Sequence, residues 1–184
     1  MLIQEINTED RLNLLAQMHV GRLACAQGPQ PYVVPFSFSY NSNYLYAFST
    51  IGQKINWMRL NPLVCVQADE VVNDEEWISI VILGRYEELP DTAECKADRD
   101  LAFQVLQQRA NWWELGYART PVRRDEVVRT WEPIYFRIKI DQITAHHCVS
   151  ESVPSSNANS KAKQTRSRVM SDMFASLRKK MFSA

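Results

Sequence analysis

A series of short strand-like runs, separated by turn residues rather than by long helices, constrains the fold of this 184-residue chain most strongly. Asn41, Ser42 and Asn43 separate the second run from the third, and asparagine tolerates the left-handed backbone of a tight hairpin. Closure into a barrel removes the exposed edges of such strands. The sequence therefore predicts a mainly β fold, an antiparallel barrel with peripheral helices. The six predicted strands are residues 20–26, 31–39, 43–49, 63–71, 77–88 and 134–141.

Three helices are expected around these strands. Asn7 or Thr8 can cap the first, because either side chain can accept a hydrogen bond from an amide of the first turn. Pro90 and Asp91 are expected to start the third, since proline suits the first position of a helix. The predicted helices are residues 8–18, 51–60 and 91–109.

The chain divides into a barrel domain and a C-terminal extension. Residues 1–149 contain all the predicted strands, and residues 150–165 are rich in Ser and Asn and read as a linker. Residues 166–184 form a basic segment in which an amphipathic helix is expected. Residues 161–184 hold seven Lys and Arg against one Asp, and the rest of the chain holds 14 against 20 acidic residues. We expect the tail to pack on the acidic body or on a dimer partner; an anionic lipid or nucleic acid is the alternative.

Composition limits the location of the protein. No apolar run approaches the roughly 20 residues that span a bilayer, and the N-terminus lacks the pattern of a signal peptide. The four cysteines are widely spaced, which favours reduced thiols over a disulfide framework. A cytoplasmic protein with no membrane or nucleic-acid partner is therefore expected.

The junction between the third strand and the second helix is a candidate phosphate site. A helix N-terminus offers unpaired amides and partial positive charge, which attract anions. Here Ser49 and Thr50 add hydroxyl donors, Gly52 allows close approach of the backbone, and Lys54 brings a full charge. The alternative is an ordinary helix cap with a solvated lysine.

Two further groups of residues are candidates for ligand contacts. Pro35 interrupts the second strand, which predicts a bulge or an edge with free backbone groups. Arg22 lies at the start of an apolar strand, an unusual place for a guanidinium that has no partner. Trp77 and Ser79 lie on an apolar run whose second face can pack on another subunit.

The remaining candidates are aromatic residues and histidines. Trp112 and Trp113 are adjacent, and they either pack in the core or cover a flat aromatic ligand. His146 and His147 point to opposite sides of a strand, so their spacing predicts no metal site. One of them could still ligate haem iron.

Five motifs in order resemble the pyridoxamine 5'-phosphate oxidase-like family of FMN-binding split barrels, in particular its nitroimidazole-resistance and flavin-nucleotide-binding branch. They are VGRLA, PYVVPFSFSY, STIGQK, WISIVILGR and IYFRIKID. The resemblance implies a six-stranded Greek-key barrel that forms a homodimer with FMN at the subunit interface.

The same resemblance implies roles for individual residues. The isoalloxazine ring would lie beside a segment of the second strand, and the ribityl chain beside the two hydroxyl residues at the end of the third. Gln53 and Lys54 would hold the phosphate, with Gln53 in place of a second basic residue. The implied cofactor contacts are Pro35, Phe36, Ser37, Ser49, Thr50, Gln53, Lys54, Trp77 and Ser79.

The implied function is that of an oxidoreductase. Flavin would supply the electron chemistry for a small aromatic or nitro compound, with a nicotinamide as a possible electron donor and Trp112 or Trp113 as a lid. The residues that bind substrate in true pyridoxamine phosphate oxidases have no counterpart, so oxidation of vitamin B6 is not expected. A flavin carrier or sensor without turnover and a haem-binding barrel are the alternatives. The sequence identifies no catalytic acid or base.

Overall fold

The computed structural model describes residues 2–108 and 133–149, which all belong to the compact unit Met1–Glu151. The predicted linker, the basic tail, Trp112 and Trp113 lie outside the described residues. The strands are β1 (Leu2–Glu5), β2 (Val20–Gln27), β3 (Gln30–Ser37), β4 (Ser39–Asn41), β5 (Tyr44–Ser49), β6 (Leu63–Asn73), β7 (Glu76–Glu88) and β8 (Ile134–Val149). The helices are α1 (Thr8–Gln17), α2 (Gln53–Leu60) and α3 (Lys96–Gln107). No helix among these residues is long and apolar enough to cross a membrane.

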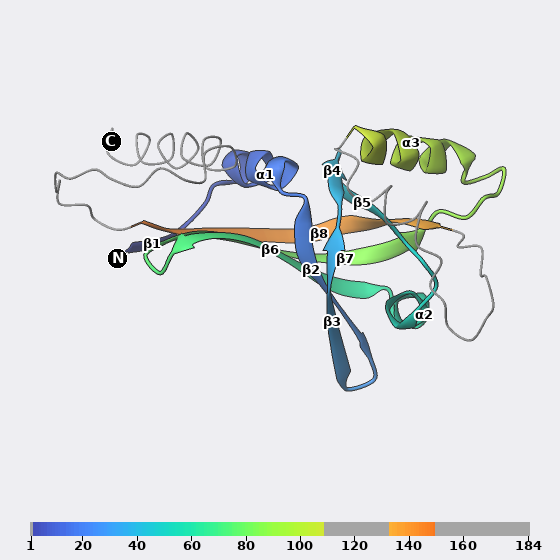
Figure 1. Ribbon diagram of the computed structural model, residues 1–184, viewed down its shortest axis with the longest axis horizontal. Helices are drawn as coiled ribbons and strands as arrows, with labels where there is room; N and C mark the ends of the chain where they lie inside the picture. Colours follow the sequence, from blue (N-terminus) through green and yellow to red (C-terminus); the bar gives the residue numbers. More distant parts are fainter. Residues whose placement is uncertain (1, 109–132, 150–184) are drawn as a thin grey trace, which may run out of the picture. The chain divides into compact units, whose positions relative to one another are not determined.

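The described strands form one antiparallel sheet in the order β3-β2-β6-β7-β8-β5-β4, and β1 pairs with the far half of β8 (Figure 1). The strands at the two ends of this order, β3 and β4, are consecutive in the chain and are separated only by Phe38. If β3 and β4 are taken as one strand that changes partners, β2 to β8 supply the six predicted strands. The mainly β class is confirmed, with eight strands rather than six.

At Phe38 the chain leaves its pairing with β2 and continues into β4, which pairs with β5. The amide of Phe38 donates to the carbonyl of His19 at 3.0 Å, and its buried ring lies 5.4 Å from the ring of Phe36. Gly21 makes room for this packing, since a Cβ atom there would come 2.8 Å from the carbonyl oxygen of Gln67 and 3.2 Å from the Phe38 ring. Pro35, predicted to mark a bulge or an edge, lies on β3, which among the described strands pairs with β2 and lies at the end of the sheet order.

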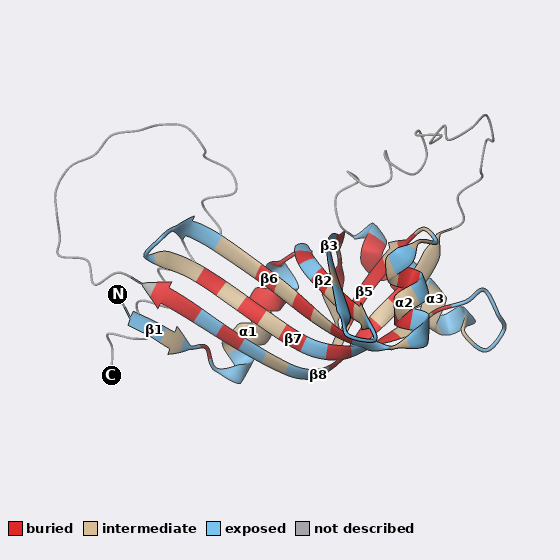
Figure 2. Cartoon of the chain, turned by 90° about the horizontal axis from the view of Figure 1, so that it is seen from below, coloured by how far each residue is buried: buried red, intermediate tan, exposed pale blue. Residues whose placement is uncertain are grey.

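The core follows the alternation of the strands. Along β7, Ile78, Ile80 and Ile82 are fully buried, and the residues between them are half-buried (Figure 2). Side chains of neighbouring strands continue this inner face, because paired residues lie on the same side of a sheet. The core also contains Leu23, Leu45, Val66, Phe136, Ile138 and Ala145.

Two predicted boundaries were wrong. The third helix begins at Lys96 rather than at Pro90, because the carbonyl of Pro90 accepts a hydrogen bond from Thr92 at 3.0 Å and a series of bends and turns follows. The last strand, β8, continues to Val149 rather than ending at residue 141. It contains a β-bulge at Asp141, because Leu83 of β7 pairs with Gln142 whereas Gly84 pairs with Ile140. After this bulge the inward-facing residues of β8 are odd-numbered instead of even-numbered. The alternation of apolar and polar residues is therefore interrupted, and the sequence pattern does not predict the second half of the strand.

Other local predictions were confirmed. The Asn7 side chain caps α1 by accepting from the amide of Asp10 at 3.0 Å. The hairpin between β4 and β5 has positive φ at Ser42 (47°) and Asn43 (72°), as a tight turn of this kind needs. The side chain of Asn43 also donates to the carbonyl of Ile140 at 3.1 Å, which ties the turn to β8.

Candidate functional site

The N-terminus of α2 has no side-chain cap. β5 ends at Ser49, and the N-cap residue of α2 is Gly52, with extended backbone and no capping hydrogen bond from a side chain. The carbonyl of Gly52 accepts the first helical bond from Asn56 at 3.0 Å, but amides of the first turn have no partner within a helix. Neither Ser49 nor Thr50 caps this helix with its side chain. The amides that follow Gly52 can serve as donors to an anion.

Lys54 adds a charge to this helix end. Its side chain is half-buried, and burial lowers the pKa of the ammonium, while the nearby thiol of Cys25 opposes that shift. Among residues 2–108 and 133–149, no carboxylate forms an ion pair with Lys54. A partly desolvated cation without a counter-charge is unfavourable, and a bound anion would offset that cost.

A buried cysteine lies beside Lys54. Cys25 is 4% exposed, and burial raises the pKa of its thiol, an effect that Lys54 opposes. All four cysteines of the chain are free, as the sequence predicted. Burial thus favours the neutral form of the Cys25 thiol beside Lys54.

Tight contacts anchor α2 to the barrel. The guanidinium of Arg59 donates from Nε and from a terminal nitrogen to the two carboxylate oxygens of Glu88, each at 2.7 Å. The hydroxyl of Tyr86 donates to the same carboxylate at 2.8 Å, and these bonds hold the pKa of Glu88 below its usual range. On the inner side Ile55 is fully buried, and the ring of Trp57 lies 5.5 Å from another ring on β3. Sequence reasoning missed this anchor because its partners are 29 residues apart.

A series of hydrogen-bonded polar side chains connects β2, β6 and β7 on the outer face of the sheet. Arg22 forms an ion pair with Asp69 and donates to the Gln67 side chain at 3.1 Å, and Gln67 donates in turn to the Ser79 hydroxyl at 3.4 Å. Arg22 pairs across the strands with Pro35. The guanidinium of Arg22 thus has partners on β6. It lies on the same face of the sheet as Pro35 and Ser79, which are two of the predicted cofactor contacts.

The predicted contacts on β3 and β5 face different directions. Pro35 is exposed on the outer face and Ser37 is half-buried, whereas the ring of Phe36 packs inside and leaves only its backbone for a ligand. Ser49 is buried at the end of β5, and Thr50 after it is half-buried. Gln53 is exposed beside Lys54 in the first turn of α2.

The structure does not bring Trp77 near Lys54 within one chain. Lys54 interacts with Cys25, in the part of β2 that pairs near Cys65 of β6, whereas Trp77 pairs with Val71 at the other end of β6. Six residues separate these two positions of β6, a distance of roughly 20 Å along a strand. Within one chain, Trp77 and the Cys25–Lys54 pair thus lie towards opposite ends of β6.

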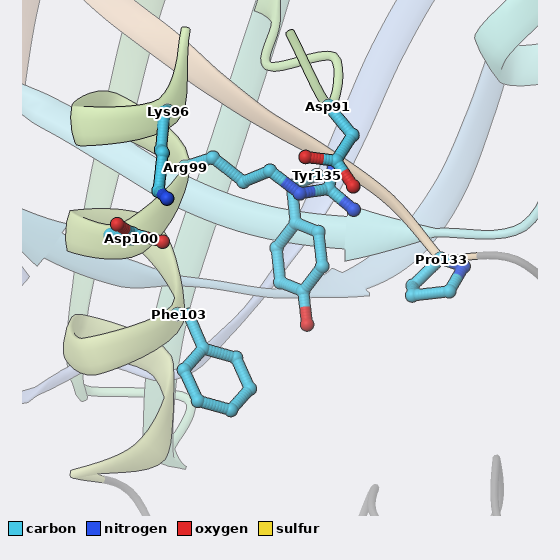
Figure 3. A pocket seen from close by; sticks show the side chains of 7 residues that line it. All are labelled: Asp91, Lys96, Arg99, Asp100, Phe103, Pro133 and Tyr135. Carbon is cyan, nitrogen blue, oxygen red and sulfur yellow. The ribbon is translucent and has the colours of Figure 1, made fainter. Parts of the chain in front are cut away.

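A pocket of about 370 Å³ lies between α3 and the start of β8 (Figure 3). Two carboxylates and two cations line it: Asp91, Asp100, Lys96 and Arg99. The apolar part of the lining is formed by Phe103, Pro133 and Tyr135. Sequence reasoning missed this pocket, because its two walls are separated along the chain by residues 109–132.

His146 and His147 lie on opposite sides of β8, as predicted. His146 is exposed and His147 is 4% exposed. Burial, and then the neighbouring His146, lower the pKa of His147. Of the two, only His146 can reach a ligand outside the core.

The strand order and the change of partner at Phe38 define an antiparallel split barrel, in which the N-terminus of α2 has no side-chain cap. The family described as pyridoxamine 5'-phosphate oxidase matches residues 7–147, so this chain belongs to that family. The resemblance seen in the sequence is thereby confirmed.

Individual relatives support the same assignment. A protein of Mesorhizobium loti described as FAD-binding is 40% identical, with a TM-score of 0.64 over 82% of this chain and 99% of that one. An uncharacterized protein of Rhizobium meliloti (strain 1021) is 38% identical over 144 residues, which are 78% of this chain and 94% of the relative. A candidate 5-nitroimidazole antibiotic resistance protein of Bacteroides thetaiotaomicron has the same fold, with 20% identity and a TM-score of 0.57 over 79% and 87% of the two chains.

Proposed function

We propose that this protein binds a flavin nucleotide, with the phosphate of its FMN portion at the N-terminus of α2. The observation that carries the proposal is Lys54, a half-buried ammonium without an ion-pair partner among the described residues, beside a helix end that no side chain caps. A phosphate group carries close to two negative charges and three acceptor oxygens. It would satisfy both the ammonium and the amides that follow Gly52.

The flavin ring is proposed to lie along the outer face of β3, beside Pro35 and Ser37. We propose that the site is completed in a homodimer by Trp77 and Ser79 of the partner subunit, because about 20 Å of β6 separates the position that pairs with Trp77 from the position beside Cys25 and Lys54. The exposed side chains of the same outer face support an interface there. Val33, Val71 and Leu83 are 58%, 61% and 48% exposed, and burying them would stabilise the dimer.

The chemistry proposed for the bound flavin is electron transfer to a small aromatic or nitro compound. The flavin would supply the redox chemistry, and the barrel would bind and orient it. Trp112 or Trp113, outside the described residues, remains the proposed lid. Four free cysteines are consistent with a reducing compartment, and we propose the cytoplasm.

Two nucleotides contain the FMN portion. FMN is the ligand that the family resemblance implies, and FAD is the second candidate, because the relative with 40% identity is described as FAD-binding. Both require the same phosphate site at α2. They differ in what lies beyond that phosphate.

Purified protein gives the direct test. We expect a flavin absorption spectrum after purification or after addition of FMN, and chromatography of the flavin released on denaturation identifies the nucleotide. Reduction by NADPH followed by reoxidation with a nitroaromatic compound separates an enzyme from a carrier. A haem spectrum would favour the haem alternative. Protein that binds neither FMN nor FAD would refute the proposal.

A further inference from the structure

One strand pairing connects the pocket beside α3 with the junction that leads into α2. Ser49, the last residue of β5 before the phosphate junction, pairs with Ile134, which stands between Pro133 and Tyr135 of the pocket. From Ser49 the chain needs only four residues to reach Gln53 at the start of α2, at most about 14 Å. A ligand held at α2 can therefore extend into this pocket.

Its aromatic wall is fixed in place. The ring of Tyr135 lies 5.9 Å from that of Phe48 and 6.4 Å from that of Phe103, which meets it edge-on at 71°. The guanidinium of Arg99 lies 4.8 Å from the centre of the Tyr135 ring and donates to the carbonyl of Leu89 at 2.9 Å. Figure 3 shows Tyr135 extending between Phe103 and Pro133, with Arg99 reaching across its base. Guanidinium and aromatic planes of this kind are surfaces on which a nucleobase stacks.

The charges of the pocket do not favour another phosphate. Among the described residues of the lining, Asp91 and Asp100 balance Lys96 and Arg99, in contrast to Lys54 at the N-terminus of α2. Ionised carboxylates only accept hydrogen bonds. They suit a neutral ring that carries an amino group and a sugar that carries hydroxyls. Adenine presents such an amino group at N6.

We propose that this pocket binds the adenosine of a dinucleotide whose flavin phosphate lies at α2, so that FAD is the preferred ligand. The proposal rests on the proposed function, since both require the phosphate site at Lys54. It assigns a binding role to Phe103, Tyr135 and the two aspartates, none of which takes part in the FMN portion of the site.

The test is a parallel titration of flavin-free protein with FMN and with FAD. Phe103→Ala is the informative variant, because this ring is 46% exposed on α3 and its removal should leave the core intact. We expect the FAD affinity to fall about tenfold, the usual consequence of losing one stacking partner, with FMN affinity unchanged. Leu101→Ala is the matched control: it removes another exposed apolar side chain of α3, outside the pocket, and should change neither affinity.

Asp100→Asn serves as a second variant, since it keeps the size of the side chain but adds donors. It should lower FAD affinity several-fold and spare FMN. The adenosine pocket would be refuted if the unaltered protein bound FAD no more tightly than FMN, or if Phe103→Ala and Leu101→Ala weakened FAD equally. In those cases flavin binding itself would stand. Failure to bind either flavin would remove the proposed function and this inference together.

Discussion

The N-terminus of α2 and the pocket beside α3 both present cations, but only the pocket balances them. Lys54 has no carboxylate partner among the described residues, whereas Lys96 and Arg99 share the pocket with Asp91 and Asp100. Two neighbouring sites of one barrel can thus favour different parts of one ligand. Charge without a partner favours a phosphate, and balanced charge beside aromatic rings favours a neutral base.

Replacement of Lys54 should have the largest effect on FMN affinity, because it removes the cation without a carboxylate partner that distinguishes the N-terminus of α2 from the pocket. Lys54→Ala removes a charge-assisted hydrogen bond worth about 1.5 to 3 kcal/mol, so FMN affinity should fall about 10- to 150-fold. Riboflavin, which lacks the phosphate, should bind as before. Lys139→Ala, which removes an exposed lysine of β8, is the control. Equal losses for FMN and riboflavin would place Lys54 outside the phosphate site.

A smaller effect is expected from the anchor of α2. Glu88→Gln breaks the two-bond contact with Arg59, which is partly exposed, so the cost in unfolding free energy should be about 1 kcal/mol. Because α2 is then held less firmly, FMN affinity should fall several-fold more than riboflavin affinity.

The neighbouring Glu87→Gln is a matched control. Glu87 lies beside Glu88 on β7 and accepts a hydrogen bond from Arg137 of β8 at 2.7 Å, so this contact joins two strands and not α2 to the barrel. We expect a similar loss of stability in thermal unfolding with an unchanged ratio of FMN to riboflavin affinity. A changed ratio for Glu87→Gln as well would show that any weakening of the barrel affects the site.

The same contrast shows what the sequence can predict. Strand positions, the Asn43 hairpin and the junction from Ser49 to Lys54 follow from local patterns, because turn residues and helix ends act over a few neighbours. The second half of β8 was missed because the bulge at Asp141 reverses its alternation. The pocket and the Arg59–Glu88 contact were missed because they join residues far apart in the chain, whose meeting depends on register. The separation of Trp77 from Cys25 along β6 is likewise a property of register, not of spacing in the chain.

Addition of a positive charge at Gln53 should increase the preference of the α2 N-terminus for phosphate, whereas removal of Lys54 should reduce it. Gln53→Lys places a second cation in the first turn of α2, at an exposed position. Such a charge should add about 0.3 to 1 kcal/mol to phosphate binding, a two- to fivefold gain in FMN affinity. Asn56→Lys, one turn further along the exposed side of α2, should give less. No gain for Gln53→Lys would mean that the phosphate lies elsewhere.

The smallest expected effect is the pH dependence that arises from Lys54. With rising pH, the stability of the ligand-free protein and the affinity for FMN should change in opposite directions. Burial lowers the pKa of Lys54 below its ordinary value of 10.5, so the unfolded chain binds more protons than the folded one as pH rises towards that value. Relative to Lys54→Met, the stability of the ligand-free protein should therefore increase towards alkaline pH. Bound phosphate favours the charged lysine, so FMN affinity should decrease over the same range, by less than about twofold while most of the lysine is still protonated. Titrations of FMN and riboflavin at a series of pH values measure this, and a parallel decline for riboflavin would assign it to another group.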